Sequence, residues 1–168
     1  WFLHFRDPGL AFDVALHLGT LFAIIIFFRQ DIIVILKSIG RTLTKRQIKT
    51  SADRLPYLLI LATIPGALGG ILLDKMAEHA LRMPLLIAFT TAVFGYILLL
   101  AERSVQKRDI KENNSKSALI TGLAQAIAII PGVSRSGITI SAGLFQDFTR
   151  ESAARFSFLI SVPIIAGA

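Results

Sequence analysis

Long apolar runs separated by charged residues set the pattern of this chain of 168 residues. The three longest runs cover residues 8–28, 55–73 and 83–101. At about 1.5 Å per residue, each is long enough as a helix to cross a hydrocarbon core of roughly 30 Å. The pattern therefore predicts an all-α integral membrane protein, a polytopic helical bundle in which these three runs span the membrane.

A different pattern begins after residue 116. Residues 117–130 are apolar but too short to cross a membrane, and Pro131 and Gly132 end the predicted helix. A polar segment, residues 134–137, and a second short apolar stretch, 138–145, follow. We predict a re-entrant helix–loop–helix over residues 117–146, with one irregular spanning helix over 117–134 as the alternative. A further span, truncated by the end of the sequence, is predicted over 155–168.

Composition supports a membrane location, because 54% of the residues are hydrophobic and only 17% are charged. The net charge of +7 comes from Lys and Arg in two stretches, 29–54 and 102–116, which favours cytoplasmic loops over nucleic-acid binding. The connection 74–82 is then expected outside. Within the first stretch, residues 31–39 fit either a helix extension or an interfacial helix. The lack of cysteine excludes disulfides and thiolate metal sites.

The ends of the sequence indicate a piece of a longer protein. It begins at Trp1 without an initiator Met and stops at Ala168 inside an apolar run. Residues 11–16 and 155–160 weakly echo one another, and both open long apolar helices. The echo fits half to two-thirds of an inverted-repeat fold.

Candidate chemistry is concentrated in the segment PGVSRSGIT at residues 131–139. An arginine at membrane depth, here Arg135, is expected to be paired and functional. Hydroxyls and glycines surround it, on Ser134, Ser136, Thr139, Gly132 and Gly137. A guanidinium, exposed amides and a helix N-terminus together favour an anion, with phosphate as the natural candidate. The plainer alternative is a turn that the hydroxyls cap while Arg135 extends to the membrane surface.

Asp13 and His17 lie four residues apart in the first predicted span and therefore share a helix face. A proton relay or a metal site is one interpretation of this pair. A polar patch packed toward a part of the protein outside this sequence is the favoured one.

Residues 131–139 match the pattern P-G-x-S-R-S-x-x-T, and the likeness continues through 153–159, 161–163, 12–14 and 18–20. On these residues the chain resembles the undecaprenyl pyrophosphate phosphatases of the bacitracin-resistance type. The resemblance implies an inverted-repeat bundle in the bacterial plasma membrane. It also implies hydrolysis of a polyprenyl pyrophosphate lipid to its monophosphate, which recycles the carrier for cell-wall synthesis.

That family uses a second motif, E-G-x-x-E-F-L-P-[VI]-S-S-T-G-H, which is absent here. By resemblance, its glutamates would hold a divalent cation, Mg²⁺ or Ca²⁺, so no metal ligand is assigned in this chain. Arg135 is expected to clamp the pyrophosphate, and Ser134 to bind it or, less favoured, to act as nucleophile. The remaining substrate-binding residues are expected to be Gly132, Ser136, Gly137 and Thr139. The expected partners are the lipid substrate and the membrane, with a homodimer left open.

Two other function classes stay open from the sequence. A transporter or flippase for an anionic or lipid-phosphate substrate also uses broken helices that meet at mid-membrane. A non-catalytic membrane scaffold would leave Arg135 without a role. The missing motif would distinguish a phosphatase from a transporter, because paired glutamates followed by S-S-T-G-H indicate hydrolysis and their absence favours transport.

Overall fold

The computed structural model describes residues 10–45, 48, 50–80 and 83–167, at some positions, such as Asp13, by the backbone alone. These residues form α-helices and one short 3-10 helix, so the predicted all-α class is confirmed. In chain order they are α1 (Leu10–Phe27), α2 (Arg29–Lys45), α3 (Ser51–Ala80), α4 (Pro84–Ala101), η1 (Ile110–Glu112), α5 (Ser115–Ile127), α6 (Arg135–Leu144) and α7 (Arg150–Gly167).

Two of the three predicted spans are helices long and apolar enough to cross a membrane unaided. They are Ser51–Leu72, within α3, and Pro84–Ala101, which is α4. The first predicted span, 8–28, meets the same test only when α1 is joined to α2 as one pair bent by 79°. In the described ranges the protein therefore has two candidate spans, or three if the bent pair counts as one.

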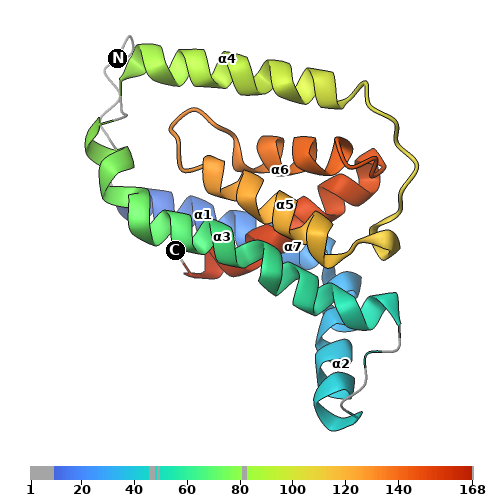
Figure 1. Ribbon diagram of the computed structural model, residues 1–168. Helices are drawn as coiled ribbons and strands as arrows, with labels where there is room; N and C mark the ends of the chain where they lie inside the picture. The colour runs from blue at the N-terminus through green and yellow to red at the C-terminus, as the bar shows by residue number, and fades with distance from the viewer. Residues whose placement is uncertain (1–9, 46–47, 49, 81–82, 168) are drawn as a thin grey trace.

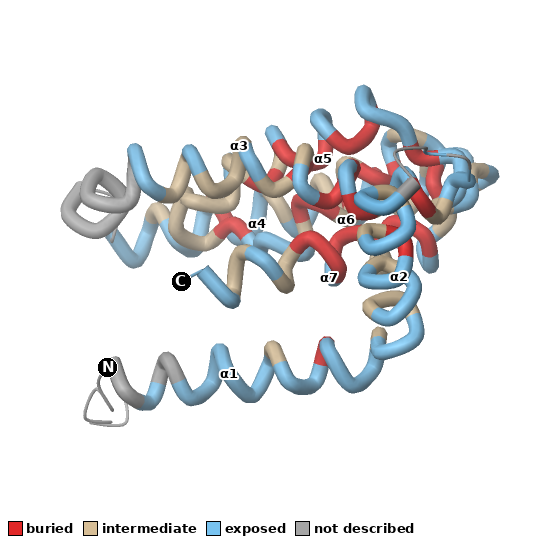
Figure 2. Tube along the Cα trace, turned by 90° about the horizontal axis from the view of Figure 1, so that it is seen from below, coloured by how far each residue is buried: buried red, intermediate tan, exposed pale blue. Residues whose placement is uncertain are grey.

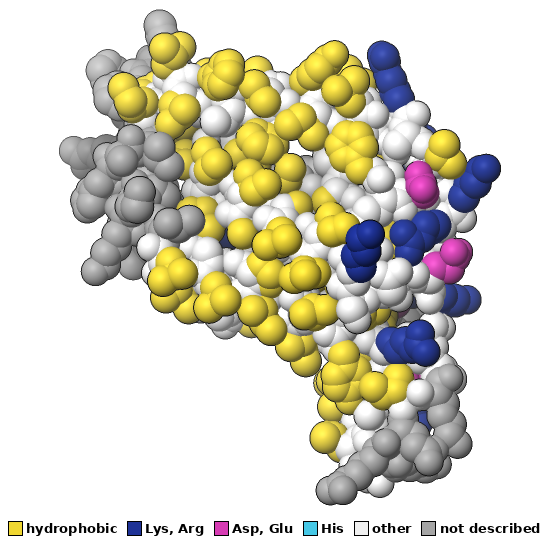
Figure 3. Space-filling model, in the orientation of Figure 1, with side chains coloured by type: hydrophobic (Ala, Val, Ile, Leu, Met, Phe, Trp, Pro, Cys, Tyr) yellow, Lys and Arg dark blue, Asp and Glu magenta, His cyan; other side chains and the backbone are white. Residues whose placement is uncertain are grey.

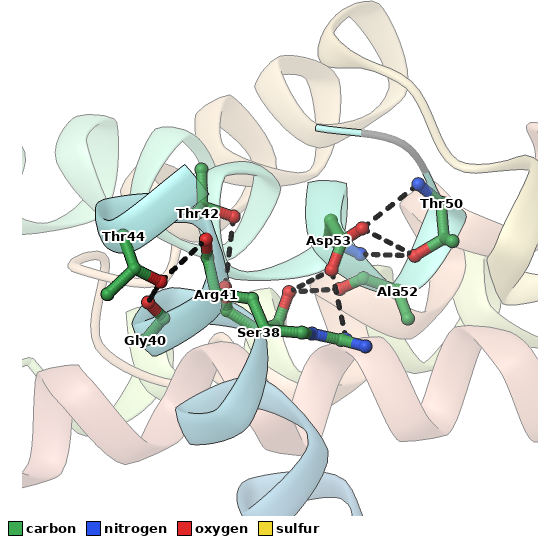
Figure 4. Close-up of polar contacts among 8 residues, drawn as sticks. All are labelled: Ser38, Gly40, Arg41, Thr42, Thr44, Thr50, Ala52 and Asp53. Carbon is green, nitrogen blue, oxygen red and sulfur yellow. Dashed lines mark hydrogen bonds and ion pairs between the residues drawn. The ribbon is translucent and has the colours of Figure 1, made fainter. Parts of the chain in front are cut away.

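The bend decides how residues 31–39 are folded. They belong to α2, a separate helix that projects away from the other helices (Figure 1). Ser38 of α2 is fully buried, and its Oγ lies 3.0 Å from Asp53 Oδ1 at the start of α3. Arg41 forms an ion pair with the same carboxylate at 3.0 Å, and Thr50 Oγ1 donates to its Oδ2 over 2.8 Å (Figure 4). Asp53 therefore ties α2 to α3.

The helices are arranged on both sides of α5 and α6 (Figure 1). Among the described helices, α4 packs on α6 alone, whereas α6 also contacts α5 and α7. Burial is concentrated in α5, α6 and α7, while α1 is largely exposed (Figure 2). Two apolar clusters form the core. The first contains Leu58, Leu59, Ala62, Ala118, Phe156, Leu159 and Ile160, and the second contains Ala101, Leu144, Phe148 and Ala153.

The backbones of α3 and α5 approach closely at Gly122. A Cβ on this residue would lie 2.5 Å from the carbonyl oxygen of Ala62, closer than real side chains come. Gly122 is buried, and α3 has more contacts with α5 than with any other described helix. A small residue at this position therefore sets the separation of the two helices.

The surface supports membrane embedding. Apolar side chains cover most of the face in Figure 3, and many are strongly exposed, such as Ile71 at 80% and Leu85 at 82%. Lys and Arg side chains gather at one end of the same face (Figure 3). Exposed apolar area on this scale is rare in soluble monomers and normal where lipid is the solvent.

Candidate active site

The motif at residues 131–139 lies between two short helices. α5 begins after Asn114, whose Oδ1 accepts a hydrogen bond from the Ser117 amide over 3.0 Å, and it ends at Ile127. α6 begins at Arg135, inside the polar segment 134–137 and three residues before the second short apolar stretch, 138–145, where the sequence analysis started this helix. The helices have 13 and 10 residues, or roughly 20 and 15 Å. Neither is long enough to cross a hydrocarbon core alone.

Ser134 is the reason that α6 starts so early. Its Oγ accepts a hydrogen bond from the Gly137 amide over 3.2 Å, the usual N-cap arrangement. Its carbonyl accepts from the Ile138 amide over 2.9 Å. The amides of Arg135 and Ser136 then occupy the first helical positions, where no carbonyl of the helix can reach them. The Ser136 Oγ lies 3.4 Å from that of Ser134. The first turn of α6 thus presents two amides and two hydroxyls together.

A cavity of about 460 Å³ opens beside this turn. Its walls come from α1, α6, α7 and the loop before α6. The lining residues are Leu16, His17, Thr20, Ile24, Ala128, Val133, Arg135, Ser136, Ser157, Phe158, Ser161 and Ile165. The structure therefore brings His17, singled out from the sequence, into the cavity that Arg135 enters. The side chain of Asp13 lies outside the described residues.

Arg135 differs from neighbouring arginines in its surroundings. Arg155 pairs with Asp31, and Arg150 with Glu102 at 2.5 Å. Arg108 donates to the Gln146 carbonyl over 3.0 Å. Arg135 lines the cavity, and none of the described residues forms a hydrogen bond or ion pair with its guanidinium. The expectation of a paired arginine is thus not met by this part of the chain.

Thr139 and Gly137 lie further along α6. Thr139 is 2% exposed, its Oγ1 donates to the Arg135 carbonyl over 2.9 Å, and it lies 2.6 Å from Ser157 Oγ on α7. This hydroxyl joins α6 to α7 and does not line the cavity. Gly137 packs on Ser134, because a Cβ there would lie 3.1 Å from the Ser134 Cβ. Gly137 therefore leaves space for the cap.

Gly132 has a conformation that suits glycine, with φ of +89°. A Cβ at this position would lie 2.2 Å from Thr90 Oγ1 and 2.6 Å from the Ile87 carbonyl oxygen. The space that a side chain at Gly132 would occupy is thus filled by α4. The sequence had suggested Gly132 as a substrate-binding residue. The loop lies directly against α4.

Several cavity residues were not assigned to the site from the sequence, although each lies in a stretch that carries the family resemblance. Ser157, Ser161 and Thr20 sit in apolar helices far from the motif along the chain. Ser157 and Ser161 are four residues apart on α7, and Thr20 is three residues after His17 on α1. Helical periodicity would therefore have assigned each of them to the site only after a neighbour on the same helix face was known to belong to it.

The described residues do not by themselves fit a divalent cation. No three His, Cys, Asp or Glu side chains come together in the ranges that the structure covers. Of these residue types, the cavity walls contain His17 alone. A bound cation would need carboxylates from beyond this set, as the resemblance implies.

An all-helical chain with two or three candidate spans and a polar cavity at a helix N-terminus defines a helical membrane protein with a site among its helices. Residues 1–168 match the family described as bacitracin resistance protein BacA. The chain belongs to this family.

Curated relatives agree with the family match. An undecaprenyl-diphosphatase of Moorella thermoacetica is 52% identical over 170 residues, which cover 100% of this chain and 63% of that protein. An undecaprenyl-diphosphatase of Hahella chejuensis is 48% identical, with 97% of this chain and 61% of the relative covered. One from Gemmatimonas aurantiaca is 46% identical over 169 residues. The chain thus spans about three fifths of the length of the relatives it matches.

Proposed function

We propose that the full-length protein containing this chain is an undecaprenyl-diphosphatase. Water would attack the terminal phosphorus and break the phosphoanhydride bond. The products are inorganic phosphate and the polyprenyl monophosphate. The observation that carries the proposal is the Arg135 guanidinium, unpaired by the described residues, at a helix start that also presents two serine hydroxyls. The relatives, each an undecaprenyl-diphosphatase by name, support the same reaction.

The chain supplies electrostatic stabilisation for this reaction. Arg135 would bind the pyrophosphate and offset the charge that develops during transfer, the main task in phosphoryl transfer. The amides of Arg135 and Ser136 and the hydroxyls of Ser134 and Ser136 would donate to phosphate oxygens. Thr139 and Gly132 would act indirectly, through the packing of α6 and the loop. The Ser134 Oγ contacts an amide and a serine, neither of which is a general base, so binding is favoured over nucleophilic attack.

His17 also lines the cavity and would lie beside the substrate. A divalent cation, Mg²⁺ or Ca²⁺, would take its ligands from residues outside this chain.

The proposal includes the membrane arrangement. Residues 117–146 would be re-entrant from the cytoplasmic side of the bacterial inner membrane, within an inverted-repeat bundle. The protein would recycle the lipid carrier for cell-wall synthesis, and its abundance would then set resistance to bacitracin. The exposed apolar surface supports the membrane location.

The test is phosphate release by the purified full-length protein in detergent or vesicles. We expect release from undecaprenyl pyrophosphate in proportion to enzyme. Movement of labelled lipid phosphate across a vesicle bilayer with no release of phosphate would support the transporter class and overturn the proposal.

A further inference from the structure

Two consecutive threonines of α4 hold the loop that leads into α6. Thr90 Oγ1 donates to the carbonyl oxygen of Pro131 over 2.7 Å. Thr91 Oγ1 donates to the carbonyl oxygen of Gly132 over 3.0 Å. Both carbonyls lie just before Ser134 and Arg135. We refer to Thr90 and Thr91 as the threonine pair.

These contacts are not the usual ones of threonines in a helix. A helical threonine commonly donates to a carbonyl three or four residues earlier. Thr90 has two such acceptors, the Leu86 carbonyl at 2.9 Å and the Ile87 carbonyl at 3.0 Å, but its contact with the Pro131 carbonyl is shorter, at 2.7 Å. For Thr91 the loop carbonyl is the hydrogen-bond acceptor that the structure gives. The hydroxyls are therefore directed at the loop.

The backbone of the loop is pressed against the same helix. Gly132 has positive φ, and a Cβ there would come within 2.2 Å of Thr90 Oγ1. The Pro131 carbonyl points toward Thr90 of α4. The C=O and N–H of one trans peptide point in opposite directions, so the Gly132 amide points away from α4. The cavity walls include no described residue of α4, so the threonine pair does not line the site.

We propose that the threonine pair positions the anion site. By fixing two carbonyls within four residues of Arg135, it sets where the first turn of α6 lies and where Arg135 meets the cavity. The threonines would not touch the substrate. The inference rests on the proposed function, and it adds α4 to the elements on which the reaction depends.

The experiment compares variants of the full-length protein. Thr90→Val together with Thr91→Val removes both hydroxyls and keeps the branched shape. Thr90→Ser together with Thr91→Ser keeps both hydroxyls. The matched control is Thr63→Val on α3, where the hydroxyl donates to the Leu59 carbonyl of its own helix over 2.7 Å.

The valine pair should lower kcat per folded protein by about 10-fold or more, with KM within about threefold, because small displacements of a catalytic group act on the transition state. Amide hydrogen exchange over residues 131–136 should become faster. The serine pair and Thr63→Val should stay near wild type in both measurements.

Unchanged kcat or unchanged exchange in the valine pair overturns the inference. If the valine pair does not fold, the single variant at the exposed position, Thr91→Val, is judged by the same two measurements. A wild-type protein that releases no phosphate would overturn the proposed function instead. In that case exchange alone decides whether the threonine pair holds the loop, with faster exchange in support and unchanged exchange against.

Discussion

Arg135 lines the cavity at the first turn of α6, as Ser136 does and Ser134 does not, and it has no counter-ion among the described residues. The sequence predicted this group because its members are consecutive along the chain. The sequence did not predict the threonine pair, since it approaches from α4 and has no local signal. Ser157 of α7 lies in a stretch that carries the family resemblance, but it was not assigned to the site. It also placed Thr139 at the phosphate, whereas a helix that starts at Arg135 puts this hydroxyl one turn further on, against Ser157.

Substitution of Arg135 tests the site most directly. Arg135→Lys keeps the charge but loses the planar two-point contact, and Arg135→Ala loses both. We expect both substitutions to lower kcat/KM in the full-length enzyme, Ala by at least ~10²-fold, which corresponds to a loss of about 2.7 kcal/mol of transition-state stabilisation. Phosphate release per folded protein is the measurement. An Ala variant within about threefold of wild type would exclude the phosphate clamp.

Ser134 separates binding from nucleophilic catalysis. Ser134→Asn keeps an N-cap for α6 but has no hydroxyl, whereas Ser134→Thr keeps both. If Ser134 binds phosphate, we expect Asn to lower kcat/KM roughly 10-fold and to leave activity measurable, since one hydrogen bond is lost. Thr should stay close to wild type. Complete loss of turnover in a folded Asn variant, with activity in Thr, would instead identify Ser134 as the nucleophile.

At the scale of the elements, the candidate spans Ser51–Leu72 and Pro84–Ala101 begin and end within four residues of the predicted runs 55–73 and 83–101. The first predicted span, 8–28, ends within one residue of α1, but the sequence left open whether residues 31–39 extend that helix or form a separate one. Residues 27–30 contain neither Pro nor Gly, and the apolar pattern continues beyond them. The bend depends on contacts distant in sequence, the Asp31–Arg155 ion pair and the bond of Ser38 to Asp53. Patterns within a segment carry no information on such contacts.

The approach of α5 to α3 gives a prediction for Gly122. Gly122→Ala would force a methyl group against the Ala62 carbonyl, and the two backbones would have to separate. Overpacking of this kind destabilises by about 1–3 kcal/mol. We expect a lower Tm for the full-length protein in detergent. Gly70→Ala is the control, because a Cβ there meets no atom within 4 Å. Equal Tm values for the two variants would contradict close packing at Gly122.

For the whole molecule, composition and charge predicted the class better than the arrangement. The apolar surface and the gathering of Lys and Arg at one end agree with a membrane protein (Figure 3). The packing of α4 onto α6 follows from neither, because an apolar helix in lipid can pack through any face. Helix order in the sequence leaves that choice open.

Labelling tests the orientation of the whole molecule. The chain contains no cysteine, so a single introduced thiol reports on one position once any others in the full-length protein are replaced. Under the positive-inside rule, Lys111→Cys should be protected from an impermeant reagent in intact cells. Met83→Cys, before α4 and 63% exposed, should be labelled. The reverse result would invert the proposed topology.

The solitary packing of α4 has a consequence for biogenesis. During synthesis α4 leaves the ribosome well before α6, the one described helix that it contacts. Over that interval no described contact can retain it, and its own partitioning into lipid must do so. Its sequence, Pro84–Ala101, is strongly apolar and carries no charge, which is suited to this. A charged residue at an outward position such as Leu85 should therefore impair the insertion of α4 at the translocon, before the fold exists.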